Sequence, residues 1–97
     1  MKTIGKRTER LNETRRRLIA TRVRTALVPH QPRRYRLLVE SDTIELRGAD
    51  WLVVVRPDRA GTPLGDSVTR MMAAEDTLRR RWKMNVSLLP AMPPEDD

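Results

Sequence analysis

Arginine is the residue type whose number and spacing in this chain suggest a chemistry. The sequence contains 17 arginines and three lysines. A guanidinium group is planar and permanently charged, and it binds phosphate or carboxylate oxygens through paired hydrogen bonds. Arg10, Arg17 and Arg24 follow one another at intervals of seven residues, which places them on one face of a helix. This face is a candidate binding surface for nucleic acid or for an acidic protein.

The other basic residues form two further groups, and the charge of the chain is segregated. Arg33, Arg34 and Arg36 follow the helix-breaking segment Pro29-His30-Gln31-Pro32, and Arg80, Arg81 and Lys83 lie near the end of a second expected helix. Residues 1–39 contain twelve basic and two acidic side chains, a net charge of +10, whereas residues 40–97 carry −3. An arginine-rich codon composition would explain the number of arginines but not this segregation. A basic first third is typical of a surface that docks on a polyanion.

Arg15 and Arg22 differ from the other arginines because they project into the apolar side of the first expected helix. A buried, unpaired guanidinium is very costly. Each side chain must therefore extend to solvent, meet a carboxylate or face a partner. Glu75, inside the apolar stripe of the second helix, is a candidate carboxylate, although Arg79 is its local alternative. If they face a partner, Arg15 and Arg22 are interface anchors, and a homodimer through the N-terminal helix is the simplest version.

The residue types that most catalytic and metal chemistry requires are missing. The chain has no cysteine, and its single histidine, His30, lies in the helix-breaking segment. Thiolate chemistry is therefore excluded, and no Ser–His or Cys–His pair is convincing. The loop expected at residues 56–65 contains glycines but matches neither the P-loop nor the dinucleotide-binding pattern. We predict a protein that is not an enzyme and has no metal site and no cofactor.

Trp51-Leu52-Val53-Val54-Val55 is the segment around which the fold is expected to form. Because side chains alternate along a strand, this segment is apolar on both faces, which is typical of a covered, central strand. Strands at residues 35–40 and 43–47 precede it, with Ser41-Asp42 as a tight turn between them. Together they predict a three-stranded antiparallel meander within residues 34–56.

These segments predict a single α+β domain over residues 1–89. It comprises a basic N-terminal helix at residues 6–28, the meander, a second helix at residues 66–84, and residues 86–89 as a short strand or extended segment. Residues 90–97, with three prolines and three acidic side chains, read as an acidic tail. The longest apolar run of five residues is far short of the ~20 that cross a membrane. We therefore expect no membrane association and a cytoplasmic location.

Two functions are compatible with this pattern. The first is nucleic-acid binding, or association with nucleic-acid machinery, through the arginine-rich surfaces, and the sequence favours it narrowly. The alternative is a non-enzymatic protein–protein interaction module that docks on an acidic partner. Adaptors, inhibitors and assembly subunits of viral or mobile-element type are examples. The sequence does not distinguish DNA from RNA.

Overall fold

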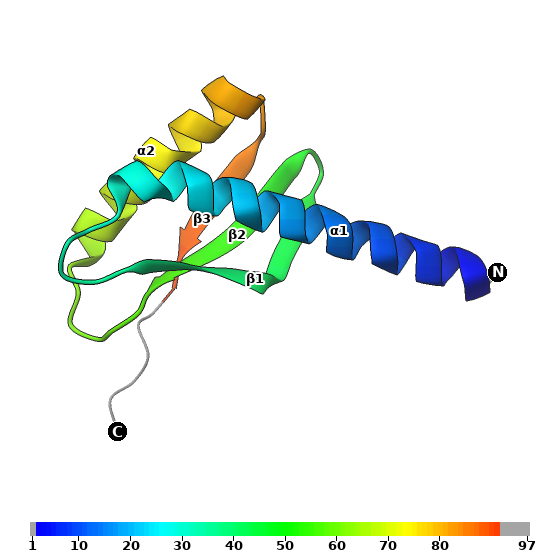
Figure 1. Cartoon of the computed structure of the whole chain (residues 1–97), viewed down its shortest axis with the longest axis horizontal. Helices are drawn as coiled ribbons and strands as arrows, with labels where there is room; N and C mark the ends of the chain where they lie inside the picture. The colour runs from blue at the N-terminus through cyan, green and yellow to red at the C-terminus, as the bar shows by residue number, and fades with distance from the viewer. Residues whose placement is uncertain (1, 92–97) are drawn as a thin grey trace.

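The computed structural model describes residues 2–91, and the side chains of residues 13–91. It contains, in order, α1 (Lys2–Leu27), the short 3₁₀ helix η1 (Val28–His30), β1 (Leu37–Arg47), β2 (Asp50–Pro57), α2 (Leu64–Trp82) and β3 (Val86–Pro90) (Figure 1). The predicted α+β class, the long first helix, the second helix and the C-terminal strand are confirmed. Both helices begin a few residues before their predicted starts, and α2 ends two residues early.

The three strands form one mixed sheet in the order β1-β2-β3. β1 and β2 are an antiparallel hairpin, whereas β2 and β3 run parallel. The predicted three-stranded antiparallel meander is therefore wrong, because the third strand comes from the end of the domain. Two parallel neighbours need a long crossover connection, and α2 supplies it.

The expected turn at Ser41-Asp42 does not form, because both residues belong to β1, which continues to Arg47. The pairing of β1 with β2 shifts register between Glu40 and Glu45, so the strand absorbs the extra residues as an irregularity. The hairpin turn is at Gly48-Ala49, where the glycine before the central strand also predicts a turn, and Gly48 has a φ of +60°. Glycine takes this conformation without steric cost at the first position of a two-residue hairpin turn, and Ser41-Asp42 offers no glycine.

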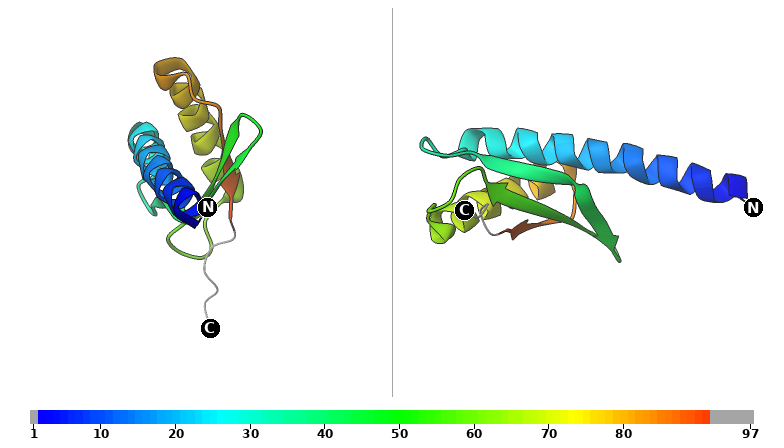
Figure 2. Two further views of the ribbon diagram at one scale, coloured as in Figure 1. Left: turned by 90° about the vertical axis from the view of Figure 1, so that its right-hand side faces the viewer. Right: turned by 90° about the horizontal axis from the view of Figure 1, so that it is seen from below.

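β2 is the central strand, as predicted, and both helices cover one of its faces (Figure 2). Val53 and Val55 on that face are 0% and 1% exposed. They pack in one buried cluster with residues from both helices, including Leu27 of α1 and Leu78 of α2. Contacts of α1 with β1 and of α2 with β3 place one helix over each edge of the sheet.

The opposite face of the sheet is not covered by any described element, so the expectation of a strand covered on both sides is wrong. The strand register places Leu38, Leu52, Val54 and Leu89 on this face. Leu38 and Leu89 are 39% and 40% exposed. Arg56 and Glu40 lie among these apolar residues, with Arg56 Nε 2.8 Å from Glu40 Oε1, close enough for an ion pair but not aligned as a hydrogen bond.

α1 packs against the domain through its second half. Residues 13–18 are exposed, and burial begins at Ile19 and Ala20 and continues through Val23 to Leu27. Leu18, immediately before this buried stretch, is 50% exposed. Figure 1 shows the first half of α1 extending beyond the sheet. Within residues 2–91, neither long helix is apolar enough to traverse a lipid bilayer.

Glu75 on α2 ties the edge strand β3 to the helix layer. Its Oε2 accepts a hydrogen bond from the N–H of Leu88 at 2.9 Å. The N–H of Ala91 bonds to the carbonyl of Val55, so alternation along the strand points the Leu88 N–H away from β2. Glu75 therefore satisfies an outward-facing amide of β3, and Pro90 has no N–H to present there. Among the described residues, Glu75 makes this contact in place of its expected ion pair with an arginine.

β3 also extends into the predicted acidic tail. Pro90 belongs to the strand, and the Ala91 N–H lies 3.0 Å from the Val55 carbonyl oxygen. The remainder of the predicted tail, residues 92–97, lies outside the described residues.

Replacing Glu75 with alanine is expected to lower the free energy of unfolding by about 1–3 kcal/mol, because the Leu88 N–H loses its acceptor in a partly buried position. Urea unfolding followed by circular dichroism measures this change. Asp76→Ala is the matched control on the same helix. Its exposed ion pair with Arg80 contributes only about 0–1 kcal/mol. Equal losses in the two variants would show that this hydrogen bond does not hold β3 in place.

Candidate functional site

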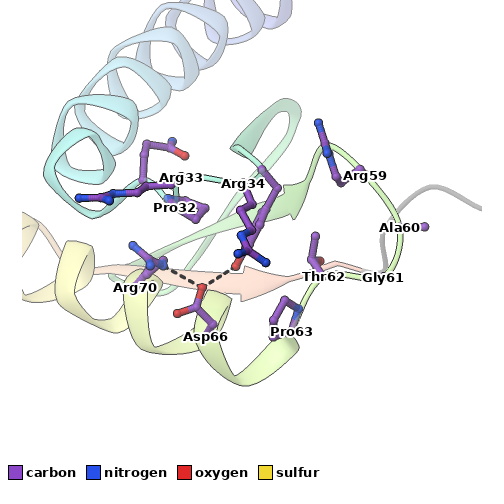
Figure 3. Close-up of a pocket in the computed structure, with 12 residues that line it drawn as sticks. Pro32, Arg33, Arg34, Arg59, Ala60, Gly61, Thr62, Pro63, Asp66 and Arg70 are labelled. Atoms are coloured by element: carbon purple, nitrogen blue, oxygen red, sulfur yellow. Dashed lines mark hydrogen bonds and ion pairs between the residues drawn. The ribbon is translucent and has the colours of Figure 1, made fainter.

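A pocket of about 600 Å³ lies where the segment before β1 meets the loop between β2 and α2 (Figure 3). Four arginines line it, and we call it the arginine pocket: Arg33, Arg34, Arg59 and Arg70. They come from three parts of the chain, namely the segment before β1, the loop after β2 and the second turn of α2. Asp66 is the one carboxylate among the lining residues.

Gln31 holds the segment before β1 in its curved path. Its side-chain amide donates to the carbonyl of Leu37 at 3.0 Å and accepts from the Leu37 N–H at 2.9 Å. This pair imitates the hydrogen bonds of a neighbouring strand. Pro29 and Pro32 prevent the preceding helix from continuing. The chain between Gln31 and Leu37 therefore forms a short, fixed loop. Arg33 and Arg34, the two pocket arginines on this loop, are exposed.

Asp58 fixes the opposite wall of the pocket. Its Oδ1 accepts a hydrogen bond from the Arg36 N–H at 3.0 Å, and its own N–H donates to the Arg36 carbonyl at 2.9 Å. This reciprocal contact continues the β1–β2 pairing beyond the strand ends. It holds Arg59, the next residue, beside the segment that carries Arg34. Further along, Gly61 takes a φ of +77°, which turns the loop back toward α2.

The base of the pocket is a hydrogen-bond network centred on Asp66, and we call it the Asp66 network. Asp66 Oδ2 accepts from the Tyr35 hydroxyl at 2.8 Å and from Arg70 Nε at 2.9 Å. Arg70 Nη1 also donates to the carbonyl of His30 at 2.8 Å. The Tyr35 hydroxyl lies 2.9 Å from Ser67 Oγ. The network thus joins η1, the segment before β1 and the first turns of α2.

The two charged groups of this network, the Asp66 carboxylate and the Arg70 guanidinium, form an ion pair with each other. The hydrogen bond from Arg70, and after it the one from Tyr35, lowers the pKa of Asp66, so its carboxylate is ionised at neutral pH. The hydrogen bond to Asp66 in turn raises the pKa of Arg70. Burial raises the pKa of Tyr35, and Asp66 adds to this effect while Ser67 opposes it. The one negative charge of the pocket is therefore already matched by Arg70.

The other three arginines of the pocket are left for a ligand. Arg33 and Arg34 have no carboxylate within 4.0 Å among the described residues. Arg59 Nε lies 3.9 Å from Asp58 Oδ1, which is a loose and exposed pair of little energetic value. The pocket consequently presents an excess of positive charge to solvent.

A second basic recess, of about 430 Å³, lies beside α1 near the loop that joins α2 to β3. Arg15, Arg22 and Lys83 line it, and no acidic side chain does. The guanidinium of Arg22 lies over the ring of Trp82, 5.2 Å from its centroid. This cation–π contact accommodates the half-buried Arg22 without a carboxylate. Arg15 is exposed to solvent. The structure therefore brings the two predicted anchors together, and neither is a buried, unpaired charge.

The remaining sequence-predicted residues do not join either recess. Arg17 and Arg24 are exposed on α1, whereas Arg10 lies outside the described side chains. Arg36 is exposed but does not line the arginine pocket. The basic face of α1 is thus open to solvent over the part that the structure describes.

In the predicted cluster at the end of α2, only Lys83 lines the second recess, and Arg80 and Arg81 line neither recess. Arg80 is in an ion pair with Asp76 at 3.2 Å, and Arg81 lies over the Trp82 ring at 4.7 Å from its centroid. Lys83 has a φ of +55°, the left-handed conformation that ends the helix. Arg80 follows Arg70 of the arginine pocket by ten residues, which is about 15 Å along the helix axis, so this cluster does not join the pocket.

Sequence reasoning identified Arg33 and Arg34 but missed Arg59 and Arg70. Both of the missed arginines have a carboxylate close by in the sequence, and they do not belong to a run of basic residues. The signals that could have found them were the glycine-containing loop expected at residues 56–65, of which the structure keeps 58–63, and the four-residue spacing of Asp66 and Arg70.

The arginine pocket suits an anion and not a cation. In the described part of the chain, no group of three or more His, Asp or Glu side chains is placed to hold a metal ion. Guanidinium groups have five N–H donors and no acceptor, so they bind oxyanions. Phosphate and carboxylate groups are therefore the chemistry that this pocket can recognise.

The ionisation of Tyr35 tests the Asp66 network directly, because this is the only tyrosine in the chain. An alkaline titration followed by ultraviolet absorbance should give a midpoint above pH 10, since burial and Asp66 disfavour the phenolate. The stabilisation that the network provides should be lost as the pH rises through this raised pKa. In Asp66→Asn the midpoint should fall, whereas the remote control Asp76→Asn should leave it unchanged. A midpoint insensitive to Asp66→Asn would contradict the contact.

Comparison of the chain with protein-family models, with curated proteins and with solved structures finds no match. No relative therefore suggests a ligand or a partner. The two basic recesses and the open face of α1 are the basis on which a function can be assigned.

Proposed function

We propose that this protein binds nucleic acid through its arginine-rich surfaces. The phosphate backbone is the polyanion that such surfaces fit, because guanidinium groups contact phosphate oxygens in pairs and release condensed counterions. The backbone would run along the exposed arginines of α1 and reach the arginine pocket at the end of that helix. A cytoplasmic location and a non-enzymatic role are parts of this proposal.

The observation that carries the proposal is the number of basic side chains that the protein's own carboxylates leave unmatched. Among the described residues, those with no carboxylate within 4.0 Å are Arg15, Arg16, Arg17, Arg22, Arg24, Arg33, Arg34, Arg36, Arg79, Arg81 and Lys83. Most of them lie on α1 and on the loop that follows it. A fold that used these side chains for internal ion pairs would have argued against an anionic ligand.

A second function, docking on an acidic protein, is favoured by the uncovered face of the sheet. Leu38 and Leu89 are partly exposed there, beside Leu52 and Val54. Nucleic acid would not use such an apolar surface, whereas a protein partner would bury it. Arg36, which alternation with the buried Leu37 directs toward this face, would then contact a carboxylate of the partner. A partner of this kind would be retained after nuclease treatment, and a nucleic acid would not.

Binding to nucleic acid should weaken steeply as the salt concentration rises. We expect the logarithm of the binding constant to fall linearly with the logarithm of salt concentration, because each phosphate contact releases counterions. Arg17→Gln and Arg24→Gln should each reduce the slope by about 0.9 for duplex DNA, or by about 0.7 for a single strand, if one phosphate contact is lost. Fluorescence anisotropy with labelled duplex and single-stranded DNA and RNA measures these slopes.

Arg56→Gln is the control for this experiment, because Arg56 lies beside Glu40 on the open face of the sheet. This variant removes a positive charge that is already paired with a carboxylate of the protein. The salt slope of the binding constant should therefore stay close to that of the wild type. An affinity that does not change between low and moderate salt would reject nucleic-acid binding. A drop in slope for Arg56→Gln equal to that for Arg24→Gln would show that net charge, and not the α1 surface, determines binding.

A further inference from the structure

We propose that the arginine pocket holds the terminal phosphate of a nucleic acid strand, an inference that rests on the proposed function and makes it more specific. The general surface on α1 would contact internal phosphates. The pocket would instead recognise the end of the strand, so the protein would prefer nucleic acid that carries a phosphate monoester at its terminus.

The charge of the pocket matches a phosphate monoester better than an internal phosphate. A monoester has a second pKa near 6, so it carries about −1.5 to −2 at neutral pH and offers three acceptor oxygens. An internal diester carries only one negative charge. Asp66 is already matched by Arg70, which leaves Arg33, Arg34 and Arg59 for the ligand. Together these three guanidinium groups carry at least one charge more than the dianion, and they offer enough donors for every phosphate oxygen.

The position of these arginines also favours a chain end. They line a recess, with Arg33 and Arg59 at opposite sides of it in Figure 3. An internal phosphate carries a nucleoside on each side, which keeps it on an open surface. A terminal phosphate has only one substituent and can enter a recess between arginines from two segments. Pro32 and Pro63, which also line the pocket, offer apolar surface to the terminal nucleoside.

The walls of the pocket are held in place before any ligand binds. Gln31 and Asp58 fix the backbone on the two sides through reciprocal hydrogen bonds. Arg70 is fixed by Asp66 and by the carbonyl of His30. A ligand then orders little beyond the side chains of the free arginines, which reduces the entropic cost of binding.

Continuity with α1 favours nucleic acid over a phosphorylated protein. α1 ends at Leu27, and the first pocket arginine follows six residues later. Figure 3 shows the last turns of α1 next to the segment that carries Arg33. Arg24 is exposed in the last turn of α1. A nucleic acid strand whose end lies in the pocket can therefore continue along the exposed arginines of α1. A single phosphorylated side chain would not need these additional arginines.

The test compares oligonucleotides of one sequence that carry a 5′-phosphate, a 3′-phosphate or hydroxyl groups at both ends. Competition anisotropy at fixed moderate salt measures their affinities for the full chain. At least one phosphorylated form should bind about tenfold more tightly than the hydroxyl form, as expected for charge-assisted hydrogen bonds to a dianion. Adding inorganic phosphate should remove the additional affinity of the phosphorylated form and leave the affinity of the hydroxyl form unchanged.

Two charge-matched double variants identify the site. Arg33→Gln with Arg34→Gln should abolish the preference for the phosphorylated end. Arg24→Gln with Arg36→Gln removes the same charge from exposed arginines outside the pocket, so it should weaken all three oligonucleotides while the preference remains. All four arginines are exposed, and thermal unfolding should confirm that both variants fold.

The outcomes separate this inference from the function on which it rests. Equal, salt-dependent affinities for all three oligonucleotides would overturn the pocket assignment and leave nucleic-acid binding standing. A preference that survives in the pocket variant would also overturn it. No binding of any oligonucleotide would reject both. A phosphoserine peptide that binds more tightly than the phosphorylated oligonucleotide would assign the pocket to a phosphorylated protein instead.

Discussion

The carboxylate of Asp66 is the point on which the arrangement of the charged surfaces depends. It accepts hydrogen bonds from Tyr35 and from Arg70, and Arg70 also donates a hydrogen bond to the carbonyl of His30. Through this one group, η1 and the segment before β1 are joined to the start of α2, which lies about 30 residues further along the chain. Because a buried or partly buried polar group must find partners, the network also restricts how these segments can pack. The end of α1 is thereby held beside α2.

The sheet imposes a second constraint, because only one of its faces is covered. With both helices on that face, the apolar side chains of the described residues concentrate into a single core around Val53 and Val55. Two acidic side chains accept hydrogen bonds from backbone N–H groups at the edges of the sheet. Glu75 binds the outer edge of β3, and Asp58 extends the β1–β2 pairing. The crossover through α2 places β3 parallel to β2, so the segment after the second helix completes the sheet.

Local patterns predicted the elements better than their connections. The apolar alternation at Val53 and Val55 identified the central strand, and helix-forming composition identified both helices, because these signals depend on neighbouring residues. The register shift after Glu40 and the parallel pairing of β3 depend on contacts across the sheet, which no local pattern contains. Likewise, Arg33 was found from its place in a basic run. Arg59 and Arg70 join it only through the fold, after the Gln31 and Asp58 contacts have curved the chain.

The partition of the carboxylates explains why so much positive charge remains on the surface. Within the described residues, the acidic groups that make contacts serve the fold: Glu75 and Asp58 bind backbone amides, Asp66 binds Tyr35 and Arg70, and Glu40, Glu45 and Asp76 pair with arginines on their own strand, its neighbour or their own helix. None of these groups lies within 4.0 Å of a described arginine side chain of α1, although Glu45 lines one recess together with Arg16. Moving Glu75, Asp58 or Asp66 to neutralise that surface would remove a backbone acceptor or a side-chain hydrogen bond elsewhere. Among the described residues, the fold therefore leaves the arginines of α1, together with Arg33 and Arg34, without an internal ion-pair partner.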